Sequence, residues 1–530
     1  MIHNVVQSQQ KFYFKSFKPW QRIGEPGDYS LVRITRLFLL LVLGKSVIVI
    51  IGAGATGLGI AWDLVLRKIP VTVVEQNGIG FGTSGRFHGL LHSGARYVVT
   101  DPTTASDCMD ENSILRNVAP SVIEPTNGLF VRVLDDDPAY EQSWLQGCQR
   151  ANIETRLLSK TQMEDFEHIN KTISSAYLVP DAVVEGFGLL QLLSKAIVAK
   201  GATLLTNHRL KSISISANEV NGVDIEGSNG SFHLACDAVV NAGGPWASEI
   251  SKLFQDPISM HLAYGLMIIF ANRKLDVVLN RLRPPGDGDI FVPHQKVTIF
   301  GTTDIDQSDP QAPKVDQAEV IRLMTLGKQL IPELDSWRVL RAFNGVRPLY
   351  EPLDSISNSS RQISRDYKLI DHHLQGGPSG AFSIVGGKLT TFRLMGEKTG
   401  DLVSKYLNVS TSCLSSQIPI DSTKPKLVKN DTSTVLCECE DIREQKLRSI
   451  DGSIDDWRIE TWFGMGPCQG TFCAHRVVGL YHQIYPEKNF EDELAHFRQE
   501  RIKGMLDVVW GSNAKQFVLQ QAIRFQSLAE

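Results

Sequence analysis

Three glycines near the start of the chain are spaced to hold the phosphates of a dinucleotide. They form Gly52-Ala-Gly54-Ala-Thr-Gly57, directly after the apolar run Val47-Ile-Val-Ile-Ile51. Gly52 permits a tight turn, Gly54 lets the backbone approach a pyrophosphate, and Gly57 lets a following helix pack closely on the strand. The free N–H groups at the start of such a helix attract phosphate. The pattern therefore predicts a dinucleotide-binding unit, with a glycine-rich turn in an ordinary α/β unit as the alternative.

A carboxylate stands where the ribose of this dinucleotide is expected. Glu75 ends the run Val71-Thr-Val-Val-Glu75, 18 residues after Gly57, and residues 58–68 between them have helical apolar spacing. A carboxylate at this position accepts hydrogen bonds from the ribose hydroxyls. The fingerprint fits NAD and FAD alike. We favour FAD, because a glycine-rich loop over residues 78–85 follows Glu75 and no further glycine-rich strand–helix unit appears later.

Four of the eight cysteines are candidate metal ligands. A C-x-C pair and a C-x₄-C pair are separated by 28 residues, and the ligands would be Cys437, Cys439, Cys468 and Cys473. Two such thiolate pairs bind zinc or an iron–sulfur cluster, and unligated structural thiols are the third alternative. The glycines of residues 464–470 would let backbone N–H groups approach cluster sulfurs. The spacing of the other cysteines predicts packing residues, namely Cys108, Cys148, Cys236 and Cys413.

Composition excludes several classes of protein. The chain has 530 residues, 42% of them apolar and 21% charged, which predicts a globular protein of two or three domains. Lys and Arg number 54 and Asp and Glu 58, so the net charge is −4. This balance gives no electrostatic case for nucleic acid as the main partner. Eight cysteines are too few for a disulfide scaffold and fit a reducing compartment.

Residues 1–45 precede the dinucleotide unit as an N-terminal extension. Its apolar run Leu37-Phe-Leu-Leu-Leu-Val-Leu-Gly44 is short of the roughly 20 residues that a membrane helix needs. The run lies too deep for a signal peptide and no cleavage site follows it. We expect a poorly ordered extension or an upstream start assigned in error, with an amphipathic surface anchor over residues 12–43 as the alternative.

The segment from Thr83 to Tyr97, Thr-Ser-Gly-Arg-Phe-His-Gly-Leu-Leu-His-Ser-Gly-Ala-Arg-Tyr, resembles the FAD-dependent glycerol-3-phosphate dehydrogenases, which are D-amino-acid-oxidase-like flavoproteins. The C-terminal cysteines are similar to the bacterioferritin-associated-ferredoxin-like [2Fe–2S] module, although their 28-residue insert is shorter than the family pattern. Together these features resemble the large (A) subunits of the anaerobic enzymes. Further matching segments are 239–247, 289–293, 300–304, 343–349 and 386–393.

The resemblance implies a fold and its domains. An α/β FAD-binding, Rossmann-like domain of the D-amino-acid-oxidase type is expected over residues 46–420. An antiparallel-sheet substrate domain would be interleaved with it, over about 126–180 and 259–365. After a Ser-, Pro- and Lys-rich linker at 415–430, a small α-rich [2Fe–2S] domain and C-terminal helices would occupy 432–530. The helices after residue 476 would dock a partner through a surface Trp510, or pack on their own domain.

The resemblance also implies site residues. Arg96, Tyr97 and Arg347 would bind substrate, and Arg347 and Lys388 would be catalytic. Arginine suits the binding of a phosphorylated substrate, because its planar guanidinium binds phosphate through two hydrogen bonds. The loop Gly386-Gly387 should open a helix whose N-terminus stabilises negative charge on a reduced flavin. The FAD contacts would be Gly52, Gly54, Gly57, Glu75, Thr83, Ser84, Gly85, His88, Gly89, Gly243, Gly387, Lys388, Leu389 and Thr390.

The sequence does not define two features of the site, namely the general base and one edge of the substrate pocket. The base that removes the substrate's hydroxyl proton is not identified, and the histidines in or beside matching segments are His88, His92 and His294. A lone histidine is more often structural than catalytic. In addition, Tyr264-Gly-Leu-Met267 stands where the family pattern has Lys-Gly-Ser, which leaves that edge of the pocket in question.

By resemblance, the chain would oxidise sn-glycerol 3-phosphate to dihydroxyacetone phosphate. Electrons would pass from FAD through the [2Fe–2S] cluster to a flavin-containing B subunit, to a membrane-anchoring iron–sulfur C subunit, and then to a quinone. The location would be the cytoplasmic face of the membrane, with peripheral attachment. One alternative is an FAD-dependent oxidase or dehydrogenase of 2-hydroxy or amino acids. The other is a non-catalytic electron-transfer subunit.

Overall fold

The computed structural model describes residues 47–352, 360, 363–420, 431–450 and 452–526. The expectations for the N-terminal extension and for most of the linker at 421–430 lie outside these residues. The described residues belong to one unit, Ser46–Glu530. No helix in this part of the chain is both long enough and apolar enough to cross a membrane.

A six-stranded sheet carries the dinucleotide fingerprint. Its central strands are parallel, and β1 lies between β13 and β2. All four residues of β1 are buried, as are those of β2 and β13, which explains why these strands consist of β-branched and small apolar residues. In sheet order the strands are β20 (Tyr367–Asp371), β21 (Ala381–Gly386), β13 (Ala238–Asn241), β1 (Ile48–Ile51), β2 (Val71–Val74) and β9 (Thr203–Leu205).

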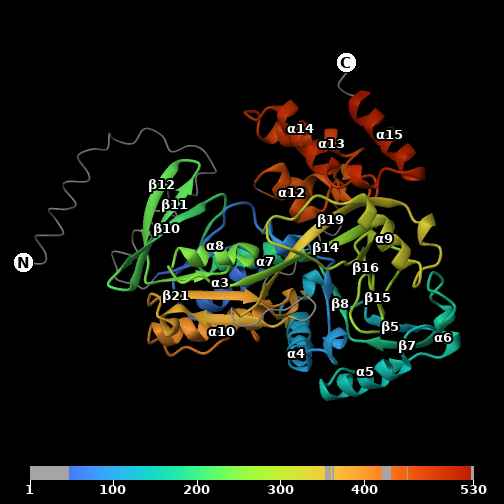
Figure 1. The fold of residues 1–530 in the computed structure, drawn as a ribbon. Coiled ribbons are helices and arrows are strands. Elements are labelled where there is room, and N and C mark those ends of the chain that lie inside the picture. The colour runs from blue at the N-terminus through green and yellow to red at the C-terminus, as the bar shows by residue number, and fades with distance from the viewer. Residues whose placement is uncertain (1–46, 353–359, 361–362, 421–430, 451, 527–530) are drawn as a thin grey trace, which may run out of the picture. The chain divides into compact units, whose positions relative to one another are not determined.

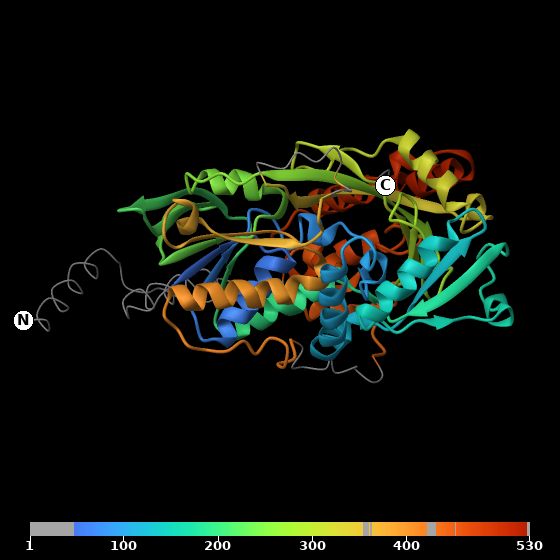
Figure 2. The ribbon, with the colours of Figure 1, turned by 60° about the horizontal axis from the view of Figure 1, so that its bottom comes forward.

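Helices α3 (Ala55–Leu66), α7 (Gly186–Ala199) and α10 (Phe392–Tyr406) pack with this sheet in one hydrophobic core. Helices α3 and α10 lie side by side (Figures 1 and 2). Glycines permit this close approach, because a Cβ on Gly396 would lie 2.6 Å from the carbonyl oxygen of Gly59. The α10 N-terminus is thereby fixed beside the fingerprint helix.

A second sheet of nine strands is built from two separate stretches of the chain. Its longest pairing joins β14 to β19, from Met260 opposite Tyr350 to Phe270 opposite Val339. The order is β18 (Ile305–Gln307), β14 (Met260–Ala271), β17 (Val297–Gly301), β16 (Ile290–His294), β15 (Val278–Arg281), β5 (Gly128–Val133), β7 (Ile173–Val179) and β6 (Arg156–Leu157), with β19 (Val339–Tyr350) paired to β14.

This sheet is mixed, whereas the sequence predicts an antiparallel one. Strands β5 and β15 run parallel, and the other pairs are antiparallel. The two strands come from different stretches of the chain, so no hairpin connection forces them to be antiparallel. Smaller sheets and further helices complete this body: β10 (Arg209–Ser216), β11 (Glu219–Gly227) and β12 (Gly230–Ala235); β3 (Leu90–Leu91), β8 (Ala182–Val184) and β4 (Ile123–Glu124); α4 (Pro102–Val118), α5 (Pro138–Arg150), α6 (Lys160–Glu164), α8 (Ala247–Lys252) and α9 (Gln317–Gly327).

The C-terminal residues have a hydrophobic core of their own, around the fully buried Trp457 and Phe463. We call residues 431–526 the cysteine module. It contacts the rest of the chain through the amide of Ala342, which donates to the Gly504 carbonyl at 2.9 Å. Its elements are β22 (Val435–Cys437), β23 (Ile442–Arg443), α11 (Glu444–Arg448), α12 (Ile454–Thr461), α13 (Ala474–Ile484), α14 (Phe490–Ile502) and α15 (Gly511–Gln526).

Trp510 does not form the exposed docking residue that the sequence analysis considered. Its side chain is half-buried and packs on the core of the nine-stranded sheet. An indole of this size buries more apolar surface there than it would at a partner-free surface. Any docking face of the C-terminal helices must therefore use other residues.

Candidate functional site

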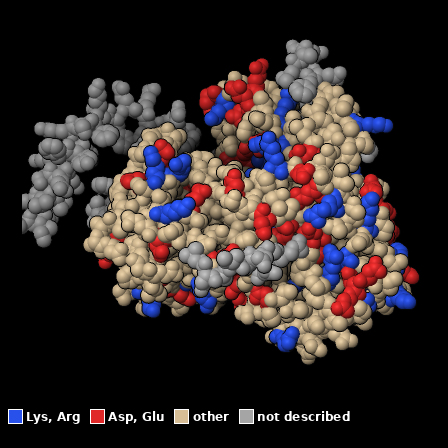
Figure 3. Space-filling model, in the orientation of Figure 1, with Lys and Arg blue, Asp and Glu red and all other residues tan. Residues whose placement is uncertain are grey.

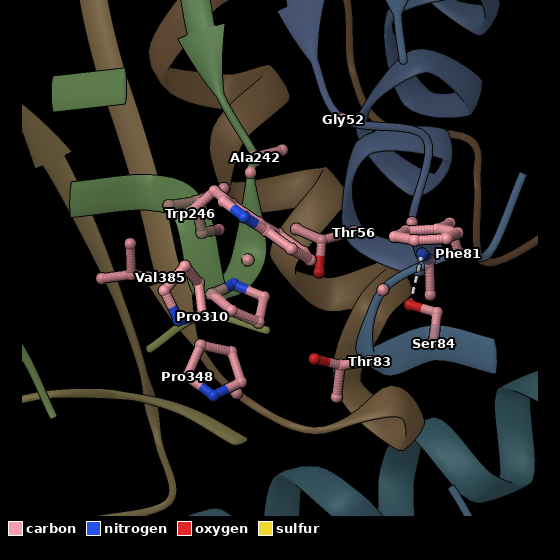
Figure 4. Close-up of a pocket in the computed structure, with 18 of the residues that line it drawn as sticks. Gly52, Thr56, Phe81, Thr83, Ser84, Ala242, Trp246, Pro310, Pro348 and Val385 are labelled. Carbon is pink, nitrogen blue, oxygen red and sulfur yellow. Dashed lines mark hydrogen bonds between the residues drawn. The ribbon is translucent and has the colours of Figure 1, made fainter. Parts of the chain in front are cut away.

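A cavity of about 770 Å³ opens at the carboxyl ends of β1, β2, β13 and β21. This is the edge of a parallel sheet at which α/β proteins bind their ligands. Figure 4 shows Thr56 of α3, Ala242 just after β13 and Val385 of β21 around one open space. The cavity lies between the six-stranded and nine-stranded sheets, because its lining also includes Arg347 and Pro348 of β19.

The glycine turn after β1 forms the part of the wall suited to a pyrophosphate. Gly52 has φ +108°, and a Cβ there would lie 2.5 Å from the carbonyl oxygen of Ala242. Helix α3 then begins, and the amide of Ala55 donates to Ser84 Oγ at 3.0 Å (Figure 4). Gly57 lies behind this wall, since a Cβ on it would collide with the Gly52 carbonyl. The turn thus presents bare backbone and a helix N-terminus to the cavity.

Glu75 lines the cavity directly after β2. Its carboxylate accepts from the amides of Ala53 and Asn77, each at 2.9 Å. Burial raises the pKa of Glu75, while these amides act in the opposite direction. The carboxylate is therefore fixed in the position that the sequence predicts for a ribose acceptor.

The start of α10 forms another part of the wall. Gly387, Lys388, Leu389 and Thr390 line the cavity, and Thr391 is the N-cap residue of the helix. The Lys388 ammonium lies 4.6 Å from the centre of the Tyr97 ring and donates to the Arg365 carbonyl at 3.0 Å. The hydroxyl of Thr390 is buried and has no hydrogen-bond partner among the residues that the structure describes. A buried hydroxyl without a partner is costly, so a bound group with a polar atom would satisfy it.

Two guanidinium groups on the cavity wall share one carboxylate. Asp304 accepts from Arg347 at 3.1 Å through one oxygen and from Arg365 at 2.9 Å through the other. Arg347 also donates to the hydroxyl of Thr302 at 2.6 Å. Asp304 is nearly buried, with 8% of its side chain exposed, and both arginines line the cavity. This part of the wall therefore presents two guanidinium groups held by one carboxylate, an arrangement that suits an anionic substrate.

Arg365 is absent from the sequence-based prediction. Its segment, Ser364-Arg-Asp-Tyr367, has no spacing that points to a site, and only the fold brings it to Asp304. Thr56, Phe81 and Trp246 also line the cavity, and no sequence pattern pointed to them.

Several predicted residues lie elsewhere than on the cavity wall. Arg96 is turned toward Asp289 and donates to its carboxylate at 2.7 Å. This carboxylate is fully buried and also accepts from Arg283, so it requires cationic partners. The wall includes Gly52, Gly54, Glu75, Thr83, Ser84, His88, Tyr97, Gly243, Arg347, Gly387, Lys388, Leu389 and Thr390, but not Gly57, Gly85, Gly89 or Arg96.

The segment around Tyr264 supports the wall from behind. Tyr264 pairs with Val346 across β14 and β19, and neither Tyr264 nor Met267 lines the cavity. A Cβ on Gly265 would meet both Thr302 and Arg347. The departure from the family pattern thus affects the support of Arg347 rather than the cavity lining.

Two of the three candidate histidines line the cavity. Burial, with Arg347 next in importance, lowers the pKa of His88 to about 3. Burial and Lys388 hold the pKa of His92 well below its usual value. Both imidazoles are therefore neutral at physiological pH, and burial makes them weak bases. His294 lies outside the cavity, against the ring of Trp462 at a centroid distance of 4.9 Å.

The four cysteines of the module lie together. The sulfur of Cys473 lies within interaction distance of those of Cys437 and Cys468, and the sulfur of Cys439 lies within interaction distance of that of Cys468. Interaction with Cys473 is the main reason that the pKa of Cys437 is lowered to about 7.

Backbone amides and small residues surround these sulfurs. Amides of Gly464 and Glu440 donate to Cys437, and those of Phe472 and Gly470 donate to Cys468. Such donors stabilise thiolates and cluster sulfurs. Nowhere in the described part of the chain, however, do three or more His, Cys, Asp or Glu side chains converge to hold a metal ion. Thiols and backbone amides are the donors that an iron–sulfur cluster needs, but these side chains are not arranged around a common centre.

Comparison with known proteins identifies the family. A model of FAD dependent oxidoreductases matches residues 48–393. The A1 subunit of the anaerobic glycerol-3-phosphate dehydrogenase of Haloferax volcanii is 34% identical over 90% of this chain and 89% of its own length. The chain belongs to this dehydrogenase family. The A subunit of the anaerobic glycerol-3-phosphate dehydrogenase of Escherichia coli K12 is also 34% identical, over 88% of this chain and 94% of that protein.

Solved structures agree with the fold of this family member. The glycerol-3-phosphate dehydrogenase of Bacillus halodurans, complexed with FAD, has a TM-score of 0.54 and 23% identity, over 73% of this chain and 70% of that one. The L-α-glycerophosphate oxidase of Mycoplasma pneumoniae, with FAD bound, has a TM-score of 0.56 and 17% identity, over 70% and 96%. The D-amino-acid-oxidase-like α/β fold predicted from the sequence is confirmed.

The residues present in this dehydrogenase-family chain fit FAD. A Cβ-free turn at Gly52 and Gly54, a helix N-terminus at Ala55 and the Glu75 carboxylate line one cavity. The buried hydroxyl of Thr390, which has no partner in the described part of the chain, lies elsewhere on the same wall. These are the groups that the pyrophosphate, the ribose and a polar ring of a flavin dinucleotide require.

Proposed function

We propose that the chain oxidises sn-glycerol 3-phosphate to dihydroxyacetone phosphate with bound FAD. The observation that carries this proposal is the pair of cavity-lining guanidiniums, Arg347 and Arg365, aligned by Asp304. A phosphate dianion would gain charge-assisted hydrogen bonds from both arginines. The names of the relatives agree with this substrate.

The flavin, when bound, supplies the acceptor for the hydride that leaves C2 of the substrate. The chain's own residues hold the substrate and take its hydroxyl proton. Arg347 and Arg365 fix the phosphate, and Lys388, with its ammonium over Tyr97, adds a further positive charge to the wall. His88 and His92 are the neutral imidazoles on the cavity wall, and burial makes each of them a weak general base.

We further propose that Cys437, Cys439, Cys468 and Cys473 hold a [2Fe–2S] cluster. Backbone amides around the sulfurs support this assignment, and zinc is the alternative. The electrons would then pass to a flavin-containing B subunit, to a membrane-anchoring iron–sulfur C subunit, and finally to a quinone. The naming of the relatives as A and A1 subunits supports such partners. The chain would attach peripherally to the cytoplasmic face of the membrane.

Charge on the surface agrees with a small-molecule substrate. On the face drawn in Figure 3, lysines and arginines are interspersed with aspartates and glutamates. Among the described residues on that face, no continuous basic stripe of the kind that binds nucleic acid is visible.

Anaerobic reduction of the purified, FAD-loaded chain tests the proposed reaction. Glycerol 3-phosphate alone should bleach the flavin absorbance, while glycerol and inorganic phosphate should not. Bleaching by a 2-hydroxy or amino acid instead would assign the chain to an oxidase or dehydrogenase of those acids. If dithionite bleaches the flavin and none of these compounds does, the chain is a non-catalytic electron-transfer subunit.

A further inference from the structure

A second cavity, of about 600 Å³, lies in the cysteine module beside the proposed cluster ligands. Cys439 and Cys468 are part of its lining, whereas Cys437 and Cys473 are each only 1% exposed. Electrons that leave the four sulfurs therefore have one open side in the described part of the module. We call this cavity and its rim the α15 groove; its lining residues are Arg338, Glu438, Cys439, Pro467, Cys468, Thr471, Phe472, Arg476, Gln516, Leu519, Gln520 and Ile523.

Large apolar side chains are exposed at the α15 groove. Phe472 is 57% exposed and Leu519 is 54% exposed, and both are among its lining residues. The first comes from the loop between two cysteines and the second from α15. Exposed apolar groups around a concavity mark sites where another molecule binds. Scattered single apolar residues would need no such explanation, but these two line the same opening.

The two arginines of the α15 groove differ in whether they have a carboxylate partner. Arg476 forms an ion pair with Glu438, with both of its terminal nitrogens within 2.6 Å of carboxylate oxygens. Arg338 has no carboxylate partner in the described structure, and it lies close enough to the sulfurs of Cys439 and Cys468 to interact with them electrostatically. Arg338 comes from the chain just before β19, so it brings a cation from the flavin-bearing body to the sulfurs.

We propose that the α15 groove is the docking site of the electron-accepting partner subunit. The partner would insert an apolar side chain between Phe472 and Leu519 and place a carboxylate near Arg338. This inference deepens the proposed function and rests on it, because it assumes that electrons leave through the cysteine module. The occupant is a protein subunit rather than a small molecule, since the relatives are subunits of larger enzymes.

Binding of the flavin-containing B subunit, which would accept the electrons first, to the full-length, FAD-loaded chain tests the proposal. The variant Leu519→Glu places a charge at an exposed position of a surface helix, where it should leave the fold intact. Leu374→Glu is the matched control, because Leu374 is 81% exposed on the six-stranded-sheet side, at residues His372–Gln375. Leu519→Met keeps an apolar group and serves as the conservative variant.

Sedimentation should show partner binding at least tenfold weaker for Leu519→Glu, and unchanged binding for Leu374→Glu and Leu519→Met. Unchanged binding by Leu519→Glu overturns the proposal. Two other results for Leu519→Glu also overturn the proposal. If the variant loses a self-association that the wild type shows, the groove binds a second copy of the chain. If partner binding is normal but a soluble naphthoquinone reoxidises the variant more slowly, the groove binds a small acceptor. Flavin bleaching by glycerol 3-phosphate is measured in parallel, so failure of the proposed reaction is seen separately.

Discussion

Arg347 and Asp304 form an ion pair of 3.1 Å on the wall of the larger cavity. Arg347 lies on β19, and Asp304 directly precedes β18. Strand β14 pairs with both strands and lies between them, with its Gly265 packed against the guanidinium of Arg347. The second oxygen of Asp304 holds Arg365. Because the carboxylate fixes both cations, neither has to lose much side-chain freedom when an anion binds.

Removal of one of these cations should impair catalysis without removing FAD. We expect Arg347→Ala to raise KM for glycerol 3-phosphate and to lower kcat, so that kcat/KM falls about tenfold to a hundredfold. The reason is that a hydrogen bond to a charged group contributes roughly 1.5–3 kcal/mol. Steady-state dye reduction gives both parameters, and the flavin absorbance per chain gives FAD content.

The matched control for this variant is Arg273→Ala. Arg273 also pairs with a carboxylate, that of Glu124 at 2.7 Å, but it lies outside the cavity. Its loss should leave kcat/KM within about twofold of the wild type. A near-normal kcat/KM for Arg347→Ala would exclude Arg347 from substrate binding.

The glycine turn should be essential for FAD and not for the fold. A side chain at Gly54 would fill the space beside Ser84, since a Cβ would lie 3.1 Å from its hydroxyl oxygen. We therefore expect Gly54→Val to weaken FAD binding at least tenfold, as measured by fluorescence titration of the apoprotein. Gly78→Ala is the control in the neighbouring loop, because no atom lies within 4 Å of the added Cβ. Equal FAD affinity of both variants would disprove the assigned pyrophosphate position.

Local patterns allowed the dinucleotide unit to be predicted from the sequence. The strand, turn, helix and carboxylate between residues 47 and 75 follow each other in the chain, and Glu75 reaches the turn at Ala53 through one hydrogen bond. Arg365 could not be predicted in this way, because its partner Asp304 is 61 residues away in the chain and both positions depend on the fold. The same holds for Arg96, whose partner Asp289 is 193 residues away.

Burial could not be read from residue type either. Trp510 looks like an interface residue in a terminal helical region, but it packs on the core of the other sheet. Conversely, Leu519 looks like an ordinary apolar residue of an amphipathic helix, and its side chain is 54% exposed. Which face of a terminal helix is covered depends on contacts with distant strands, and sequence periodicity does not specify those contacts.

The cysteine module should lose its cluster when one ligand is replaced, while the flavin stays bound. We expect Cys468→Ser to lose iron, acid-labile sulfide and the electron paramagnetic resonance signal of the dithionite-reduced protein. FAD content and bleaching by substrate should persist, because the dinucleotide cavity has no lining residue from the module. Cys413→Ser is the control, since Cys413 already contacts the hydroxyl of Ser415 and tolerates a polar group. Bound zinc without iron in the wild type would contradict the cluster assignment.

His294 should make the protein less stable in acid. Its side chain is 3% exposed, and burial lowers its pKa to about 4, against about 6.5 in an unfolded chain. Between pH 6.5 and 4 the unfolded state therefore binds a proton that the native state does not, so the free energy of unfolding falls as the pH falls. From pH 7.5 to 5.0 this one group should lower it by about 2 kcal/mol.

The variant His294→Gln lacks this proton and should lose less stability over the same interval. Urea unfolding at pH 7.5 and 5.0 measures the difference, with the wild type losing about 2 kcal/mol more than the variant. His482→Gln is the control, because His482 is exposed on α13 and its replacement should change stability equally at both pH values. His294 packs against Trp462, and a Cβ on Gly89 would lie 2.4 Å from its ring. If the wild type and His294→Gln respond to pH in the same way, His294 is hydrated or protonated in the native protein, and this packing is wrong.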